Sequence, residues 1–118
     1  GFCFSEERGR TLENIVFLEL KRRGYEIYFH QEKKECDFLI RDGYKISQAI
    51  QVCESLSDPA VREREMDGLM DAMTTYGLTD GLIITEDEEG DEIVELDSKK
   101  YHIRIVSCWK WLLMKRDY

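Results

Sequence analysis

The sequence predicts a single α/β domain in which helices flank a central mixed β-sheet. Apolar residues recur first at helical spacing, then in three short strand-like segments, and then at helical spacing again before another strand. One sheet with helices packed on it satisfies this α-β-β-β-α-β order, which a β-hairpin and a short helix extend. A length of 118 residues is enough for one hydrophobic core, so residues 1–118 are expected to form one domain.

The first helix is expected from about Glu6 to Arg23, with Ser5 as its N-terminal cap. Gly24 follows a last turn rich in basic residues and is expected to end the helix. The next segment, 25–30, reads as a strand. The helical stripe consists of Leu12, Ile15, Val16 and Leu20.

Two further strands are expected on either side of Asp42-Gly43. The apolar residues of both strands stand at even positions. Paired residues of antiparallel strands lie on the same face, so the apolar residues share a face only if the residue numbers of each pair have an even sum. A three-residue loop, 41–43, satisfies this by pairing Ile40 with Tyr44, with Gly43 in the left-handed conformation. The apolar sets are Cys36, Phe38 and Ile40, then Ile46, Ile50 and Val52, which leaves Asp37, Gln51 and Cys53 together on the opposite face.

The second helix is expected to begin near Pro59, capped by Asp58 or Ser57. A short buried strand, 81–85, follows it. Segments 92–96 and 101–107 read as a hairpin, and 108–115 as a closing helix. The core stripe of the second helix consists of Met66, Leu69, Met70, Met73 and Tyr76.

The composition indicates a soluble globular protein, with 42% hydrophobic and 36% charged residues. No apolar run approaches the roughly 18 residues of a membrane helix, and no signal peptide is expected. A net charge of −8 argues against strong nonspecific binding of nucleic acid. The short basic runs have two interpretations, a local basic patch or a solvated surface. The candidates are Lys21, Arg22, Arg23, Lys33 and Lys34.

The cysteines favour reduced thiols in a cytoplasmic protein. The four of them form no CxxC pair and only two histidines are present, so their spacing does not favour a zinc site. The chain opens at Gly1 without an initiator Met, from which we expect a fragment of a longer protein. The cysteines are Cys3, Cys36, Cys53 and Cys108.

Three oxygen-bearing side chains are candidate ligands of a hard divalent cation. Asp37 and Gln51 share a predicted sheet face, and Glu13 joins them if the first helix packs across the sheet edge. Such a cluster would hold Mg²⁺ or Mn²⁺ and activate water for phosphodiester cleavage. The simpler alternatives are that Glu13 is an exposed helix acid and that Asp37 pairs with Lys or Arg.

Three segments in this order resemble the PD-(D/E)XK nuclease-like superfamily, whose common core is restriction-endonuclease-like: "RGRTLENIVFLELKRRGYEIYF", "ECDFLI" and "IQVCE". More narrowly, the chain resembles the C-terminal DUF4143-type domain of uncharacterised bacterial and archaeal AAA-type ATPases. The resemblance extends from about Gly9 to Leu113 and rests on the order and spacing of short motifs.

The resemblance implies roles for four residues. Glu13 matches the helix acid, Asp37 the strand aspartate, and Gln51 the position of an acid or glutamine. Cys53 stands where the superfamily has a lysine. A thiol neither positions water nor stabilises phosphate charge unless its pKa is lowered. A basic residue that has migrated is the alternative, and the candidates are Lys21, Arg62 and Arg64.

The resemblance therefore implies an accessory nuclease-fold domain of an ATPase, catalytically degenerate at Cys53, that binds nucleic acid or protein. The alternatives are an active Mg²⁺-dependent DNA endonuclease with a migrated basic residue and a pure protein-interaction module. No GxxxxGK[ST] loop is present, so ATP hydrolysis would belong to another region of the same polypeptide. That ATPase domain is the expected partner.

Overall fold

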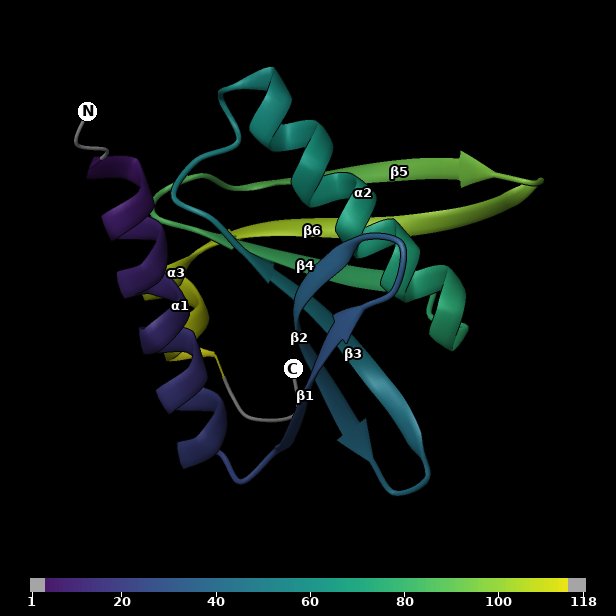
Figure 1. Cartoon of the computed structure of the whole chain (residues 1–118), viewed down its shortest axis with the longest axis horizontal. Helices are drawn as coiled ribbons and strands as arrows, with labels where there is room; N and C mark the ends of the chain where they lie inside the picture. The colour runs from purple at the N-terminus through teal and green to yellow at the C-terminus, as the bar shows by residue number, and fades with distance from the viewer. Residues whose placement is uncertain (1–3, 115–118) are drawn as a thin grey trace.

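A computed structural model describes residues 4–114 and places their helices and strands in the predicted order (Figure 1). Cys3 lies outside these residues. No helix within them is both long and apolar enough to cross a membrane. The elements are α1 (Phe4–Arg22), β1 (Glu26–Gln31), β2 (Glu35–Asp42), β3 (Lys45–Val52), α2 (Pro59–Tyr76), β4 (Asp80–Thr85), β5 (Gly90–Leu96), β6 (Lys99–Ser107) and α3 (Cys108–Leu113).

The strands form one mixed sheet in the order β1-β2-β3-β4-β6-β5. β3 pairs with β4, and β4 with β6, in parallel, whereas the other neighbours are antiparallel. The predicted α/β class is confirmed. The predicted hairpin, β5 and β6, turns at Asp97 and Ser98, which both have positive φ.

The central strands of the sheet are buried on both faces. α1 and α3 cover one face and α2 covers the other, each over its own apolar cluster (Figure 1). The sequence placed the apolar residues of β2 and β3 on one face only, but helices on both sides of the sheet require apolar residues at odd and even strand positions alike. α2 contributes Leu69, Ala72 and Met73 to its cluster, and α1 contributes Leu12, Val16 and Leu20 to the other.

The end of α1 is held against α3 by Arg23. Its guanidinium donates to Glu19 Oε2 at 2.7 Å and to the carbonyl of Trp111 at 3.1 Å, and it stacks on the Trp111 ring. Arg23 is buried, so it does not belong to the predicted basic patch. The helix also begins at Phe4, before Ser5, so the predicted Ser5 cap was wrong.

The β2–β3 hairpin places Phe38, Ile40, Ile50 and Val52 on one face, but not through the predicted loop, and Ile46 packs on the opposite, α2 side. Asp42 pairs with Lys45, which leaves a two-residue turn in which Gly43 has a φ of 66°. The residue numbers of the partners Asp42 and Lys45 have an odd sum, whereas those of the partners Ile40 and Gln48 have an even sum. The sum changes because Ser47 is an extra residue in β3. A β-bulge therefore supplies the shift that the sequence assigned to the loop.

A second irregularity lies at Asp37. β1 pairs Tyr28 with Leu39 and then His30 with Cys36, so two residues of β2 stand opposite one residue of β1. The bulge changes the alternation of β2. Cys36 consequently packs on the α2 side, although the sequence placed it with Phe38 and Ile40.

α2 crosses the sheet at very short range. Asp58 caps the helix by accepting from the Ala60 N–H, as predicted. Gly68 lies so close to β2 that an added Cβ would stand 1.9 Å from the carbonyl oxygen of Glu35 and 2.5 Å from Nε2 of Gln51. Only a glycine permits this approach without a shift of the backbone.

Replacing Gly68 with alanine is therefore expected to lower the free energy of unfolding by about 2–4 kcal/mol, because a backbone carbonyl cannot move aside as a flexible side chain can. Urea denaturation followed by circular dichroism measures this. Gly9→Ala is the matched control, since nothing lies within 4 Å of its added Cβ. Equal stability of the two variants would contradict the close crossing.

Candidate functional site

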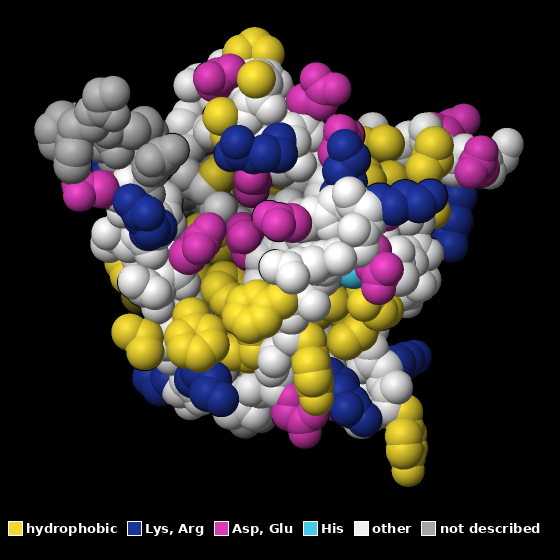
Figure 2. All heavy atoms as spheres, viewed as in Figure 1, with side chains coloured by type: hydrophobic (Ala, Val, Ile, Leu, Met, Phe, Trp, Pro, Cys, Tyr) yellow, Lys and Arg dark blue, Asp and Glu magenta, His cyan; other side chains and the backbone are white. Residues whose placement is uncertain are grey.

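The candidate site lies where β2 and β3 separate, between α1 and α2. Figure 2 shows acidic side chains gathered in this region, directly above a group of hydrophobic side chains over α1 and β1. Glu13 comes from α1 and Asp37 from the bulge of β2. Gln51 comes from the end of β3. The bulge accounts for the position of Asp37, because bulges redirect a strand side chain.

Asp37 and Gln51 are joined by hydrogen bonds that replace the backbone ladder at this point. The Asp37 N–H donates to Oε1 of Gln51 at 2.8 Å. The Val52 N–H donates to Oδ2 of Asp37, also at 2.8 Å. The two side chains thus bridge the strands just beyond the last ladder pair, Phe38 with Ile50.

The amide of Gln51 also ties the strands to α2. Nε2 of Gln51 donates to the carbonyl oxygens of Glu35 and Glu65, each at 3.0 Å. The side chain is buried, with the residue only 2% exposed. Both amide protons and the amide oxygen therefore have partners in the protein, as buried polar groups require.

The carboxylates of the site repel one another in a desolvated environment. Burial raises the pKa of Asp37 from 3.8 to about 7, although the hydrogen bond from Val52 opposes the rise. The negative charges of Glu13, Glu65 and Glu35 add to it. Burial also raises the pKa values of Glu13 and Glu65. The structure therefore concentrates negative charge from two helices and a strand.

Glu65 is a site residue that the sequence analysis missed. Its Oε1 atom is buried and has no hydrogen-bond partner among the described residues, while Oε2 accepts from Arg64 at 3.4 Å. A signal was present in the sequence, because Glu65 precedes the core residues Leu69 and Ala72 at helical spacing. An acid in line with a buried helix face is uncommon unless it has a partner.

Cys53 lies close to these acids but carries no charge. Burial, followed by the charges of Glu65, Glu88 and Asp37, raises the pKa of its thiol to about 12. The neutral thiol can neither orient an attacking water as an ammonium would nor stabilise charge on a phosphate. The charge that the resemblance assigns to this position is therefore missing.

Of the basic residues considered as replacements for the missing lysine, Arg64 lies near the site and Arg62 is engaged elsewhere. Arg64 lies near the site, since its charge lowers the pKa of both Glu65 and Cys53. Arg62 instead forms an ion pair with Glu92 of β5. Arg10 on α1 lies near Glu13 and lowers its pKa.

One of the predicted ligands of a divalent cation already has a partner in the protein. The oxygen of Gln51 already accepts from Asp37. Across residues 4–114, no three His, Cys, Asp or Glu side chains stand close enough together to hold a metal ion. Binding of Mg²⁺ by Glu13, Asp37 and Gln51 stays a prediction.

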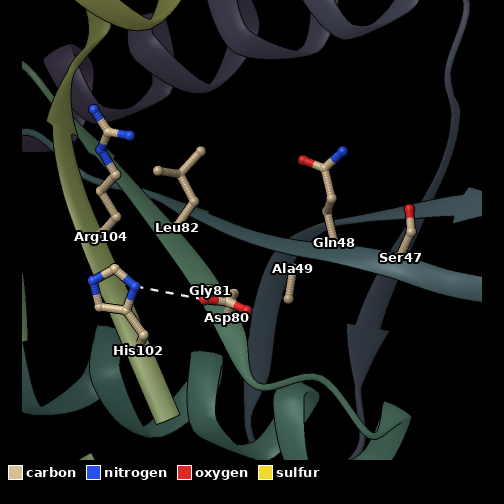
Figure 3. Close-up of a pocket in the computed structure, with 8 residues that line it drawn as sticks. All are labelled: Ser47, Gln48, Ala49, Asp80, Gly81, Leu82, His102 and Arg104. Atoms are coloured by element: carbon tan, nitrogen blue, oxygen red, sulfur yellow. Dashed lines mark ion pairs between the residues drawn. The ribbon is translucent and has the colours of Figure 1, made fainter. Parts of the chain in front are cut away.

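A separate cavity of about 390 Å³ lies on the sheet away from these acids. Figure 3 shows Gln48, Leu82 and Arg104 pointing to one side of it from three adjacent strands, with the ion pair of Asp80 and His102 at its edge. None of the four predicted site residues lines it.

Comparison with known proteins leaves the family open. No protein-family model matches the chain. The chain is similar to the uncharacterised protein MJ1544 of Methanocaldococcus jannaschii, with 42% identity over 120 residues that cover 96% of this chain. It spans only 26% of that relative. The resemblance to DUF4143-type nuclease-like domains therefore stays a prediction.

Replacing Asp37 with asparagine is expected to stabilise the fold above pH 7 and to have little effect below about pH 4. The pKa of Asp37 rises on folding, so the folded state binds a proton more tightly than the unfolded state, and stability is lost as pH rises from about 4 to about 7. Asparagine keeps an acceptor for Val52 without the charge. We expect a gain of about 1–3 kcal/mol at pH 8, measured by urea denaturation at both pH values. Equal effects at the two pH values would contradict the raised pKa.

Replacing Gln51 with glutamate is expected to destabilise the protein by at least about 2 kcal/mol at pH 8. The new oxygen would face the carbonyl oxygens of Glu35 and Glu65, which now accept from Nε2. Gln48→Glu is the matched control on the same strand, because Gln48 is only half-buried. A Gln51→Glu protein as stable as the control would show that the amide bridge is dispensable.

Proposed function

We propose that this chain is a catalytically degenerate nuclease-fold domain that binds a partner rather than cleaving a phosphodiester. The observation that carries the proposal is the state of the two residues at the end of β3 and just after it. Gln51 is fully engaged in holding the fold together, and Cys53 is a buried, neutral thiol.

Hydrolysis of a phosphodiester needs an oriented water and positive charge near the phosphate. Arg64 is the described basic residue that lies near both Cys53 and Glu65, but its Nε already contacts Glu65. Arginine also stays protonated, so it can stabilise charge but cannot accept a proton. These properties support binding over catalysis.

An accessory role within a longer ATPase is the second part of the proposal. The M. jannaschii relative extends well beyond the part that is similar to this chain, since the similarity covers 26% of it. That ratio is consistent with a module in a longer polypeptide. The assignment of an ATPase to the remainder rests on the sequence resemblance alone.

An active Mg²⁺-dependent nuclease is the second candidate, and one observation favours it. Burial raises the pKa values of Glu13, Asp37 and Glu65 together, and a divalent cation would neutralise the charges that repel one another. In that case Gln51 would turn its oxygen toward the metal, and Arg64 would supply the missing positive charge.

The purified domain is expected to leave linear, branched and single-stranded DNA intact in the presence of Mg²⁺ or Mn²⁺. The expectation follows from the missing ammonium group at position 53. Product analysis on denaturing gels, with single-turnover amounts of protein, detects even slow cleavage.

The control is the Asp37→Asn protein, which removes the central carboxylate while keeping its hydrogen bond. Metal-dependent cleavage by the wild-type domain that disappears in Asp37→Asn would refute the degenerate site and favour the active nuclease. Cleavage that persists in Asp37→Asn would indicate a contaminating enzyme and leave the proposal intact.

A further inference from the structure

An exposed apolar surface adjoins the acidic site. We call it the α1–β1 surface, and its members are Leu18 of α1 and Phe29 of β1. Leu18 and Phe29 are each 65% exposed, which is unusual for two large apolar side chains on neighbouring elements. Figure 2 shows hydrophobic side chains gathered over these two elements.

The α1–β1 surface is continuous with the acidic site through an aromatic cluster. The centroid of the Phe38 ring lies 5.9 Å from that of Phe29 and 6.3 Å from that of Phe17. Phe38 directly follows Asp37, and Phe17 stands one helical turn after Glu13. The aromatic rings of Phe17 and Phe38 thus lie next to the acidic residues Glu13 and Asp37, between α1 and β2.

β1 is also an edge strand of the sheet. Its outer edge therefore offers backbone groups to an added strand. Edge strands are usually protected by charged residues or by a covering element, yet the middle of β1 carries Tyr28 and Phe29. An extended peptide can pair with such an edge while its side chains reach the neighbouring surface.

We propose that the α1–β1 surface is the docking site of a protein segment in which a Lys or Arg side chain stands next to apolar residues. The apolar residues cover Leu18 and Phe29, and the basic side chain enters between α1 and α2 to reach Glu65 and Asp37. This inference rests on the proposed function, because it makes the degenerate site a place of recognition.

Charge complementarity identifies the occupant. The acids of the site lie in a desolvated region, and Oε1 of Glu65 is a buried acceptor without a partner among the described residues. Arg10 and Arg64 already lie beside Glu13 and Glu65, but the pKa values of both acids remain raised. A further cation would add hydrogen bonds and relieve the repulsion, as basic side chains do at acidic interfaces.

Other occupants match the same surface less well. A nucleic acid would bring phosphates against the carboxylates of a chain with a net charge of −8. A second copy of the chain would bring an identical acidic site toward this one across a two-fold axis. A basic, apolar segment of another protein matches both the charge and the apolar surface.

Selection of random displayed peptides on the immobilised domain tests the proposal. The enriched peptides are expected to share a Lys or Arg flanked by aromatic or aliphatic residues. One such peptide, made synthetically, is expected to lose more than about tenfold in affinity to Phe29→Ser and to Glu65→Gln in fluorescence anisotropy. Ile93→Ser is the control, because Ile93 is 63% exposed on β5 at the opposite edge of the sheet.

Several results would overturn the inference. These are enriched peptides without a basic residue, an equal loss of affinity in Ile93→Ser, binding of a single-stranded oligonucleotide that depends on Phe29, or a dimer in sedimentation that Phe29→Ser dissociates. Glu13→Gln, at a partly exposed position, keeps the test valid if Glu65→Gln does not fold. DNA cleavage is measured separately, so failure of the degenerate site and failure of the docking site remain distinguishable.

Discussion

One buried amide holds the site together. Gln51 joins β2, β3 and α2 through its contacts with the Asp37 N–H and the carbonyls of Glu35 and Glu65. These bonds exist only because Gly68 lets α2 approach the strands closely. The same contacts draw Glu65 toward Asp37, so the helix crossing that stabilises the fold also concentrates the acids.

The consequence is a site with excess negative charge. Burial makes each carboxylate harder to ionise, and the neighbouring acids increase the effect. A metal ion, a proton or a basic side chain can each relieve the repulsion between the carboxylates. A metal ion would correspond to an active nuclease, a proton to the isolated domain, and a basic side chain to a bound partner. The neutral Cys53 and the engaged Gln51 favour the last two, while the exposed Phe29 beside the acids favours a partner.

The register of β2 and β3 shows how a prediction can be right for an incomplete reason. Alternation requires Phe38 and Ile50 to face the same core, and the structure pairs them directly. The sequence assigned the necessary shift to a three-residue loop, whereas the structure has a two-residue turn and a bulge at Ser47. Both solutions satisfy the same parity, and only packing along the strand distinguishes them.

The sequence by itself determined the order of elements, the α/β class and the closeness of Asp37 to Gln51, because these follow from periodicity and from pairing between strands adjacent in the chain. The tertiary structure alone decided that Glu65 joins them, that Arg23 turns inward to Trp111, and that Cys36 changes sides at the bulge. Each of these depends on where a helix crosses the sheet or where a strand pair slips. Such contacts join residues far apart along the chain, and no local pattern encodes them.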